Sequence, residues 1–534
     1  MNYGFVIDNR MCIGCHACTV ACKSEFDVPL GVNRTHVKYI EKGEFPHNTR
    51  EFSVHRCNHC ADAPCVEICP TTALHTRADG IVDFDNDRCI GCKSCMQACP
   101  YDALYIDPET NTAAKCNYCA HRIDGGYEPA CVVVCPVEAI ISGDLDDTNS
   151  KIAQLVANED TMTRKPEKST VPNLYYINGT TEMLDPNATK RDGDYVWSEQ
   201  ATGVGHYAKY ADQRLAESDT ENLLVQLSME NSARTGKPID KRAIDNVAQE
   251  IQQVDTQEAR RVYDSPSKGV LWGWEVPAYV WTKAIATGTF LMMAVWHYFN
   301  GGLDASSEMA GLIITLIFMG LTGALLVKDI DRPDRFLYVL LRPQWKSWLV
   351  RGAYIITGFG GLVSLKFLDN YFKLGFDWLW IPGVIFAGLG AIYTAFLFNQ
   401  ARARDLWQTP IQSAIHMLVH AVMAGSVVMM IIAPDSSQWM VNILFWGIVA
   451  NMIIIAKEIL LPHNTPDAKK AIELMTKGYY SKYFWVGIVV GSLLPIAILN
   501  TVPGLSIIAG GLALVGIYLT EFVRIRVPQM IALS

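Results

Sequence analysis

The alternation of apolar and polar residues divides this chain of 534 residues into three parts. Residues 1–143 contain short strand-like apolar runs between groups of cysteines. Residues 144–268 are polar and rich in turn-forming residues, and residues 269–534 alternate long apolar runs with short polar loops. These patterns predict a small α+β domain, a polar linker or docking segment, and an all-α membrane domain.

Eight apolar runs in the last part are each close to the roughly 20 residues that a helix needs to cross a bilayer. Their approximate limits are 277–300, 308–328, 349–368, 377–399, 411–433, 438–460, 482–500 and 504–525. The sequence therefore predicts an all-α bundle of eight transmembrane helices surrounded by membrane lipid.

Basic residues are distributed unequally between the two ends of these predicted helices. One end carries Lys328, Arg332, Arg335, Arg342, Lys346, Arg351, Arg402, Arg404, Lys457, Lys469, Lys470, Lys477, Lys482, Arg524 and Arg526. The loops at the other end offer Lys366 and Lys373. Because cytoplasmic loops are enriched in lysine and arginine, we expect the first end, and the cysteine-rich domain that precedes it, to face the cytoplasm from the cytoplasmic membrane. The opening residues NYGFVIDNR, with neither an apolar export signal nor a twin-arginine motif, agree with this expectation.

The polar middle part is expected to be a linker or a strap that docks onto the cysteine-rich domain or onto a partner. Apolar residues recur at helical spacing between residues 242 and 264, so a helix is predicted there. The remaining sequence, which includes KPEKSTVPN and LDPNATKRDGDY, favours turns.

Composition narrows the classes of function. Half of the residues are hydrophobic, 19% are charged, and the formal net charge is -9. An acidic balance of this kind gives no reason to expect nucleic acid as a partner. All 16 cysteines lie between Cys12 and Cys135. In a chain expected in a reducing compartment, such clustering favours thiolate–metal sites over disulfides.

The cysteines form four groups of four. The groups are Cys12, Cys15, Cys18 and Cys22; Cys57, Cys60, Cys65 and Cys69; Cys89, Cys92, Cys95 and Cys99; and Cys116, Cys119, Cys131 and Cys135. The third group, CIGCKSCMQACP, matches the bacterial ferredoxin run C-x2-C-x2-C-x3-C-P, in which three cysteines bind one [4Fe-4S] cluster and the fourth binds its neighbour. The groups must then work in pairs, and they suffice for four [4Fe-4S] clusters in two ferredoxin-like units. Structural zinc is disfavoured because it uses well-separated CxxC pairs, often with histidine.

The order of the four groups, with an insertion between Cys119 and Cys131, resembles the iron–sulfur subunits of the DMSO reductase family of molybdopterin oxidoreductases. This resemblance implies a separate molybdopterin-containing catalytic subunit as a partner. It also implies four ligand sets. Set one is Cys12, Cys15, Cys18 and Cys135, nearest the catalytic subunit; set two is Cys22, Cys116, Cys119 and Cys131; set three is Cys69, Cys89, Cys92 and Cys95; and set four is Cys57, Cys60, Cys65 and Cys99, nearest the membrane.

The membrane part resembles the NrfD-like family, the membrane subunit of polysulfide reductase and its relatives. The resemblance is carried by GWEVPAYVWTKAIATG (273–288), DIDRPDRFLYVLLRPQWKSWLVRG (329–352) and GYYSKYFWVGIVVGSLLP (478–495). It implies eight spans, no haem and a quinone site near the iron–sulfur side. Two subunits that are usually separate chains would here be fused.

The positions of the histidines in the predicted spans also disfavour a haem. A b-type haem held between helices needs axial ligands from different helices. His416 and His420 lie on one helix, and His297 lies near the far end of another. No haem is therefore expected.

Polar residues inside the spans are candidates for a quinone site, because they are costly in a membrane and usually functional. Lys283 lies about two turns into the first span, where it could donate to a quinone carbonyl, relay a proton, or form a salt bridge. The other candidates are Tyr279, Asp329, Arg332, His416 and His420, for which ordinary packing is the alternative.

Together these features predict an electron-transfer and quinone-reactive subunit of a membrane-bound molybdopterin oxidoreductase, with the catalytic site in the partner. Four clusters would connect that partner with menaquinone or ubiquinone from the quinone pool. Two alternatives stay open. One is a subunit of another quinol-oxidising, energy-converting complex with a cytochrome partner, and the other is an ion transporter or scaffold that uses its clusters as a redox sensor.

Overall fold

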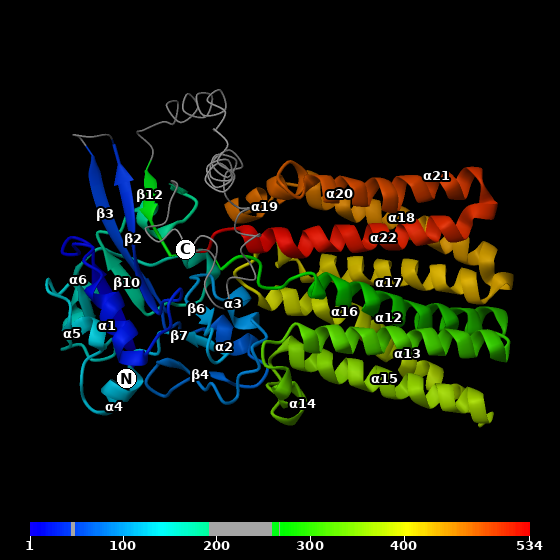
Figure 1. Ribbon diagram of the computed structural model, residues 1–534, viewed down its shortest axis with the longest axis horizontal. Coiled ribbons are helices and arrows are strands. Elements are labelled where there is room, and N and C mark those ends of the chain that lie inside the picture. The colour runs from blue at the N-terminus through cyan, green and yellow to red at the C-terminus, as the bar shows by residue number, and fades with distance from the viewer. Residues whose placement is uncertain (44–47, 192–258, 266–267) are drawn as a thin grey trace, which may run out of the picture.

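The structure, a computed structural model, describes residues 1–43, 48–191, 259–265 and 268–534. A domain of strands and short helices lies at one end of a long helical bundle (Figure 1). The C-terminus leaves the bundle and reaches the α+β domain, where the Ser534 hydroxyl donates a hydrogen bond to Asp102. The predicted α+β domain followed by an all-α bundle is confirmed.

The first sheet is built around strand β1 (Tyr3–Asp8). Its order is β8 (Ile140–Asp144), β1, β10 (Leu174–Ile177) and β9 (Thr161–Met162). Strand β1 pairs antiparallel with β8 and parallel with β10. Its apolar run suits an inner strand because β-branched and aromatic residues pack well on a buried pleated surface. Strands β9 and β10 come from the polar middle part, and the predicted boundary after residue 143 falls within β8.

The second sheet also combines distant segments. Its order is β11 (Lys190–Arg191), β12 (Arg260–Tyr263), β2 (Thr35–Lys42) and β3 (Thr49–Arg56). Most of the helix predicted within residues 242–264 lies outside the described residues. Its last part is a strand rather than a helix, because β12 pairs antiparallel with β2, a partner that local spacing does not reveal.

Short hairpins and helices complete the domain; five of the sixteen cysteines lie in these helices, and the others lie in the loops between elements. The hairpins are β4 (Leu74–Thr76) with β5 (Val82–Phe84) and β6 (Leu104–Ile106) with β7 (Ala113–Lys115). The helices are α1 (Ala17–Phe26), α2 (Pro64–Ile68), α3 (Ser94–Ala98), α4 (Ala120–Asp124), α5 (Ala130–Val133), α6 (Lys151–Asn158) and α7 (Thr181–Leu184). This is the ferredoxin-like arrangement of strands and short helices that the sequence predicts.

In the described part of the chain, eight helices are long and apolar enough to cross a membrane, which confirms the predicted number. They are α12 (Glu275–Asn300), α13 (Ala305–Lys328), α15 (Trp348–Phe372), Asp377–Gln400 with α16 (Trp380–Gln400), α17 (Pro410–Ile432), α18 (Ser437–Leu460), Ser481–Thr501 with α20 (Ser481–Ile488), a π-helical turn (Val489–Leu493) and α21 (Leu494–Thr501), and α22 (Ser506–Arg526). Two shorter helices, α14 (Tyr338–Leu341) and α19 (Pro466–Thr476), lie in loops at the end nearest the α+β domain (Figure 1).

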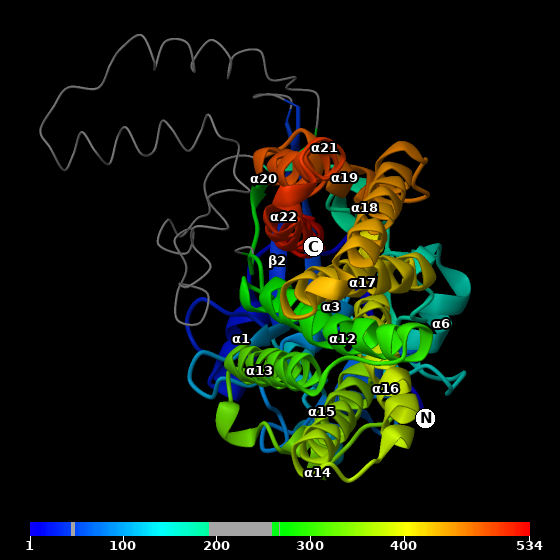
Figure 2. The same ribbon diagram turned by 90° about the vertical axis from the view of Figure 1, so that its right-hand side faces the viewer.

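Helices α12 and α17 lie in the middle of the bundle, as the view along its axis shows (Figure 2). They cross closely at two glycines. A Cβ atom on Gly288 would lie 1.8 Å from the Ala421 carbonyl oxygen, and one on Gly425 would lie 2.0 Å from the Gly288 carbonyl oxygen. Only glycine fits at such a contact between backbones. The crossing fixes the relative position of the two helices that carry Lys283 and the two candidate histidines.

Candidate functional site

Two cavities of the α+β domain are lined by cysteines of different sequence groups. Set one, namely Cys12, Cys15, Cys18 and Cys135, lines a cavity of about 330 Å³. Set three, namely Cys69, Cys89, Cys92 and Cys95, lines a cavity of about 380 Å³. Each set thus draws its fourth cysteine from a different group, as a paired ferredoxin arrangement requires.

The other two sets are also brought together. In set two, Cys22, Cys119 and Cys131 each interact electrostatically with Cys116. In set four, both Cys60 and Cys65 interact with Cys57 and with Cys99, which comes from the next group. All sixteen cysteines lie in the described residues, and none of them forms a disulfide.

The environment of these cysteines suits iron–sulfur clusters. Burial raises the pKa of the Cys18 thiol to about 11 and that of the Cys92 thiol to about 12. Buried thiols of this kind stay neutral unless a metal stabilises the thiolate. Arg56, which is 2% exposed, donates from Nη1 to the Cys131 Sγ at 3.0 Å, and its Nε and Nη2 have no hydrogen-bond partner in the described structure. A buried cation beside thiols fits a group that carries negative charge.

The loop of the third cysteine group packs directly onto the bundle. The Lys93 ammonium donates to the Asp329 carbonyl at 2.7 Å, and the Arg332 N–H donates to the Ile90 carbonyl at 3.2 Å. Nearby, the Ser347 hydroxyl donates to the Ile68 carbonyl at 2.7 Å. These contacts hold the loops after α13 and before α15 against the α+β domain.

A cleft opens at this junction, between the α+β domain and helices α12, α13, α15 and α16. It contains about 1010 Å³ of non-atom space, including its mouth. The walls are mostly apolar, but Cys92, Ser94, Tyr279, Asp329 and Tyr393 also line it. The cleft therefore joins a cysteine of set three to polar side chains within the membrane domain.

The position of Cys92 changes the order of the two inner ligand sets. The resemblance implies that set four is nearest the membrane, yet set three adjoins the cleft through Cys92. The Trp272 indole N–H donates to the Cys92 carbonyl at 3.3 Å and strengthens this contact. The spacing of cysteines does not reveal which loop faces the bundle, because that depends on the docking of Lys93 onto Asp329.

Lys283 lies behind the wall of the cleft. It is 1% exposed, its ammonium donates a hydrogen bond to the Thr394 hydroxyl, and it lies 4.3 Å from the ring centroid of Tyr393. Tyr279, one turn earlier on α12, and Tyr393, next to Thr394, both line the cleft. Lys283 is therefore separated from the cleft by these two rings.

Arg332 occupies a different place from Asp329. Its guanidinium pairs with Asp334 at 2.8 Å and donates to the Thr110 carbonyl at 3.2 Å. It therefore holds the junction between the domains together, and it is absent from the lining of the cleft.

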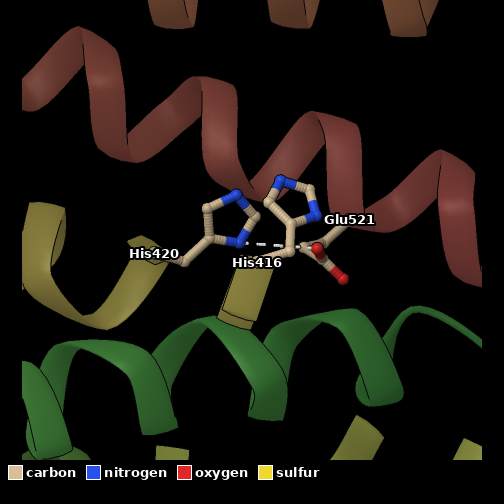
Figure 3. Close-up of side chains that lie close together, drawn as sticks. All are labelled: His416, His420 and Glu521. Atoms are coloured by element: carbon tan, nitrogen blue, oxygen red, sulfur yellow. Dashed lines mark ion pairs between the residues drawn. The ribbon is translucent and has the colours of Figure 1, made fainter. Parts of the chain in front are cut away.

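His416 and His420 belong to a second polar region, which we call the histidine–carboxylate cluster. Its members are His416, His420, Asn451, Glu458, Glu521 and Arg524. In Figure 3 the two histidines of α17 and Glu521 of α22 point toward one another. None of the six lines the cleft. The sequence candidates thus divide between two regions of the bundle.

Tyr393 and most of the histidine–carboxylate cluster were not predicted from the sequence. Glu521 had the clearest signal, since a carboxylate inside the predicted span 504–525 is costly unless it has a partner. Tyr393 had no comparable signal, because aromatic residues are common in transmembrane helices and only the fold shows which of them face a cleft.

Comparisons with known proteins agree with this division of the chain. Residues 49–145 match a 4Fe-4S dicluster domain, and residues 264–532 match the family described as polysulphide reductase, NrfD. The α+β part is similar to the B component of the polysulfide reductase of Wolinella succinogenes, with 43% identity over 178 residues that cover 33% of this chain and 93% of the relative. It is also similar to the B component of the tetrathionate reductase of Salmonella typhimurium, with 44% identity over 188 residues, or 34% of this chain and 75% of the relative.

A third relative is the protein NrfC of Escherichia coli, which is 44% identical over 180 residues that cover 33% of this chain and 81% of the relative. The curated relatives match the iron–sulfur part, whereas the NrfD family accounts for the membrane part. The chain therefore belongs to the NrfD family of polysulfide reductase membrane subunits, and it carries an iron–sulfur subunit of the DMSO and polysulfide reductase type in the same polypeptide.

Proposed function

We propose that this chain transfers electrons between a separate catalytic subunit and a quinone bound at the membrane domain. The observation that carries the proposal is the cleft at the junction. Its lining contains Cys92 of set three from the α+β domain and Tyr279, Asp329 and Tyr393 from the membrane domain. An apolar cleft with a few polar groups is typical of a site for a small organic ligand. A quinone in this cleft would lie next to the electron carrier that could reduce or oxidise it.

The four ligand sets are proposed to hold four [4Fe-4S] clusters, each of which passes single electrons when bound. Sets one and two are joined by α1, which carries Cys18 and Cys22. Sets three and four are joined by α3 with the residue that follows it, because Cys95 belongs to one set and Cys99 to the other. These shared elements favour electron transfer within each pair of clusters.

In the cleft, a quinone would take up two electrons and two protons when it is reduced. Tyr279 and Tyr393 offer hydroxyl groups and ring faces at the wall. The Asp329 carboxylate, close to the Lys93 ammonium at 3.6 Å, offers a group that can accept or give a proton. Lys283 lies behind the two tyrosine rings and is proposed to exchange protons with this wall.

The catalytic partner is proposed to dock at the end of the α+β domain that lies away from the bundle. Helices α1 and α5 lie at that end (Figure 1). Cys15 of set one, two residues before α1, is exposed, and Ile13, Val20 on α1 and Val133 on α5 are 54%, 63% and 62% exposed. Exposed apolar side chains beside a redox site favour a protein interface. The relatives are subunits of reductases, which supports a separate catalytic partner. We propose that this partner contains molybdopterin, as the resemblance of the four cysteine groups to the DMSO reductase family implies.

The orientation follows from the basic residues at the end of the bundle that contacts the α+β domain. We propose that this domain faces the cytoplasm from the cytoplasmic membrane. Arg402, for example, bonds to Asp62 at 2.7 Å across the junction, so this basic end and the α+β domain share one side of the membrane.

Four measurements test the function. Iron and sulfide analysis of the anaerobically purified chain should give about sixteen of each per chain, four per ligand set. The dithionite-reduced chain should then reduce menadione, a naphthoquinone, and the optical spectrum should lack haem bands. The native complex should contain molybdenum or tungsten. A content near eight irons, no reaction with menadione, or a multihaem cytochrome in place of the molybdopterin subunit would each contradict the corresponding part of the proposal.

A further inference from the structure

The histidine–carboxylate cluster lies inside the bundle and has no role in the proposed electron path. Five of its six members are at most 5% exposed: His416, His420, Asn451, Glu458 and Glu521. They come from three helices, α17, α18 and α22, that pack against one another. Because buried ionisable groups in a membrane are costly and usually functional, we expect this cluster to have a function of its own.

The hydrogen bonds of Asn451 fix the protons on the two imidazole rings. Its Oδ1 lies 2.6 Å from the His416 Nε2 and 3.0 Å from the His420 Nε2. An amide oxygen only accepts hydrogen bonds, so each ring carries a hydrogen on Nε2. The His416 Nδ1 in turn accepts a hydrogen bond from the Arg524 guanidinium. His416 is therefore a neutral ring with both nitrogens engaged.

His420 differs from His416 at its other nitrogen. The His420 Nδ1 faces the Glu521 Oε1 at 3.4 Å and has no hydrogen-bond donor among the described residues (Figure 3). A ring with its only hydrogen on Nε2 would turn a lone pair toward a carboxylate oxygen, which is repulsive. A proton between the two atoms turns this contact into an attraction. The geometry therefore requires one proton at the His420–Glu521 contact.

The charges of the cluster also indicate that it holds one proton. Glu458 and Glu521 provide two negative charges, and Arg524, which bonds to both of them at 3.0 and 3.1 Å, provides one positive charge. One negative charge is left, and a single proton balances it. The fourth helix that packs here, α12, contributes Lys283, which interacts electrostatically with Glu521. The same balance is kept if the proton rests on Lys283 instead.

A metal ion fits the cluster less well than a proton. His416, His420 and Glu521 could together offer ligand atoms within 4.8 Å of one another. A divalent ion would exceed the single negative charge, however, and it would have to displace Arg524 from both Glu521 and His416. The His416 Nδ1 lone pair that a metal would need already accepts the hydrogen bond from Arg524.

A small cavity adjoins the cluster on the side of the iron–sulfur domain. It contains about 320 Å³ of non-atom space and borders Glu458, Glu521 and Arg524. It also reaches Leu406 and Trp407, in the loop between α16 and α17 on that side. The lining of this cavity is more apolar than polar, but it has room for a water molecule beside these three charged side chains, and water conducts protons.

We propose that the His420–Glu521 pair holds an exchangeable proton and passes it toward the cleft through Lys283. This inference rests on the proposed quinone function. In each reduction the quinone gains two electrons from the clusters and two protons. The pair supplies one of these protons and regains it through the cavity at Leu406 and Trp407, while the other enters through the mouth of the cleft. Quinol oxidation runs the same transfers backwards.

The test uses the full chain with its clusters in lipid nanodiscs and menadione as the quinone. The variants are His420→Gln and Glu521→Gln. The matched control is His297→Gln, a histidine near the C-terminal end of α12 and outside the cluster. Menadione reduction by the dithionite-reduced chain is followed across a pH series. Both variants should lose rate by about 10²-fold on the alkaline side, where protons are scarce, because general acid–base groups contribute about that factor. The control should keep the wild-type profile.

An infrared titration of the oxidised chain provides a readout that needs no quinone. The wild type and the control should show a protonation signal of the pair that shifts in D2O, and both variants should lose it. Because the wild-type signal can be measured without any variant, this experiment tests the inference even if a variant fails to fold.

The outcomes separate the two proposals. If wild-type protein fails to reduce menadione but shows the infrared signal, the quinone function is wrong and the proton site stands. If both variants reduce menadione with the wild-type pH profile, or if the wild type lacks the signal, the inference is overturned. One tightly bound Zn²⁺ per wild-type chain, lost in both variants, would overturn it in favour of a metal site.

Discussion

Two arginines with little solvent exposure show how differently the two regions of this molecule balance charge. Arg524, in the bundle, bonds to the carboxylates of Glu458 and Glu521. Arg56, in the iron–sulfur domain, bonds to the Cys131 thiol and stacks 4.7 Å from the ring centroid of Phe5. Because an unpaired buried charge is very costly, Arg56 needs a negative partner that clusters would supply. The domain is thus organised around cofactors, whereas the bundle balances its charges with its own side chains.

The largest effect is expected from ligand replacement at the cleft. Cys92→Ser should remove the cluster of set three, abolish electron transfer to menadione and lower the iron content by about four per chain. Cys99→Ser, in the same sequence group, should instead remove the cluster of set four. Electron paramagnetic resonance of reduced samples distinguishes the two losses. Identical spectra from both variants would contradict the assignment of these cysteines to different sets.

Packing of the central helices should matter next. Gly288→Ala places a Cβ atom 1.8 Å from the Ala421 carbonyl oxygen, where backbone rather than a flexible side chain must move. Overpacking of this kind costs on the order of 3 kcal/mol. Gly320→Ala, on α13, is the matched control because nothing lies within 4 Å of its added atom. Thermal unfolding of the bundle should shift for the first variant and stay unchanged for the second, with the iron content preserved in both.

The iron–sulfur domain and the helical bundle also differ in which of their features can be predicted from the sequence. Cysteine spacing predicts the ferredoxin-like domain, because each ligand triplet is local, and hydropathy predicts the eight helices, because the membrane acts on each span separately. Strands β10 and β12 were not predicted, since their partners β1 and β2 lie more than a hundred residues away. The cleft likewise assembles Tyr279, Asp329 and Tyr393 from separate segments, and the sequence pointed to only the first two.

A smaller effect, confined to the quinone reaction, is expected for Lys283. Replacement by alanine removes the ammonium that bonds to Thr394 behind the cleft wall. The clusters should assemble and be reduced by dithionite as in the wild type, while menadione reduction should slow by about 10²-fold. Stopped-flow kinetics of cluster reoxidation gives the rate. A wild-type rate in correctly assembled protein would show that this lysine only packs the bundle.

The smallest effect is expected when the positive charge of Arg56 is removed, and it concerns the reduction potentials of the nearby clusters. Cluster potentials depend on nearby charge and on hydrogen bonds to sulfur. At about 5 Å and an effective dielectric constant of about 20, one unit charge contributes about 3 kcal/mol, on the order of 100 mV for one electron. Arg56→Met removes a positive charge beside Cys131, and a cluster loses the group that favours its extra electron. The potentials of sets one and two should therefore fall.

Lys115 provides the matched comparison for Arg56. It is also buried, bonds to the Cys116 carbonyl at 2.9 Å, and interacts electrostatically with Cys57 of set four. Lys115→Met should therefore lower the potential of set four, whereas Arg56→Lys should restore most of the potential lost in Arg56→Met. A redox titration followed by electron paramagnetic resonance measures each potential. If Arg56→Met left every potential unchanged, the positive charge of this arginine would not be balanced by the clusters. The proposed difference between Arg56 and Arg524, which is balanced by carboxylates, would then be wrong.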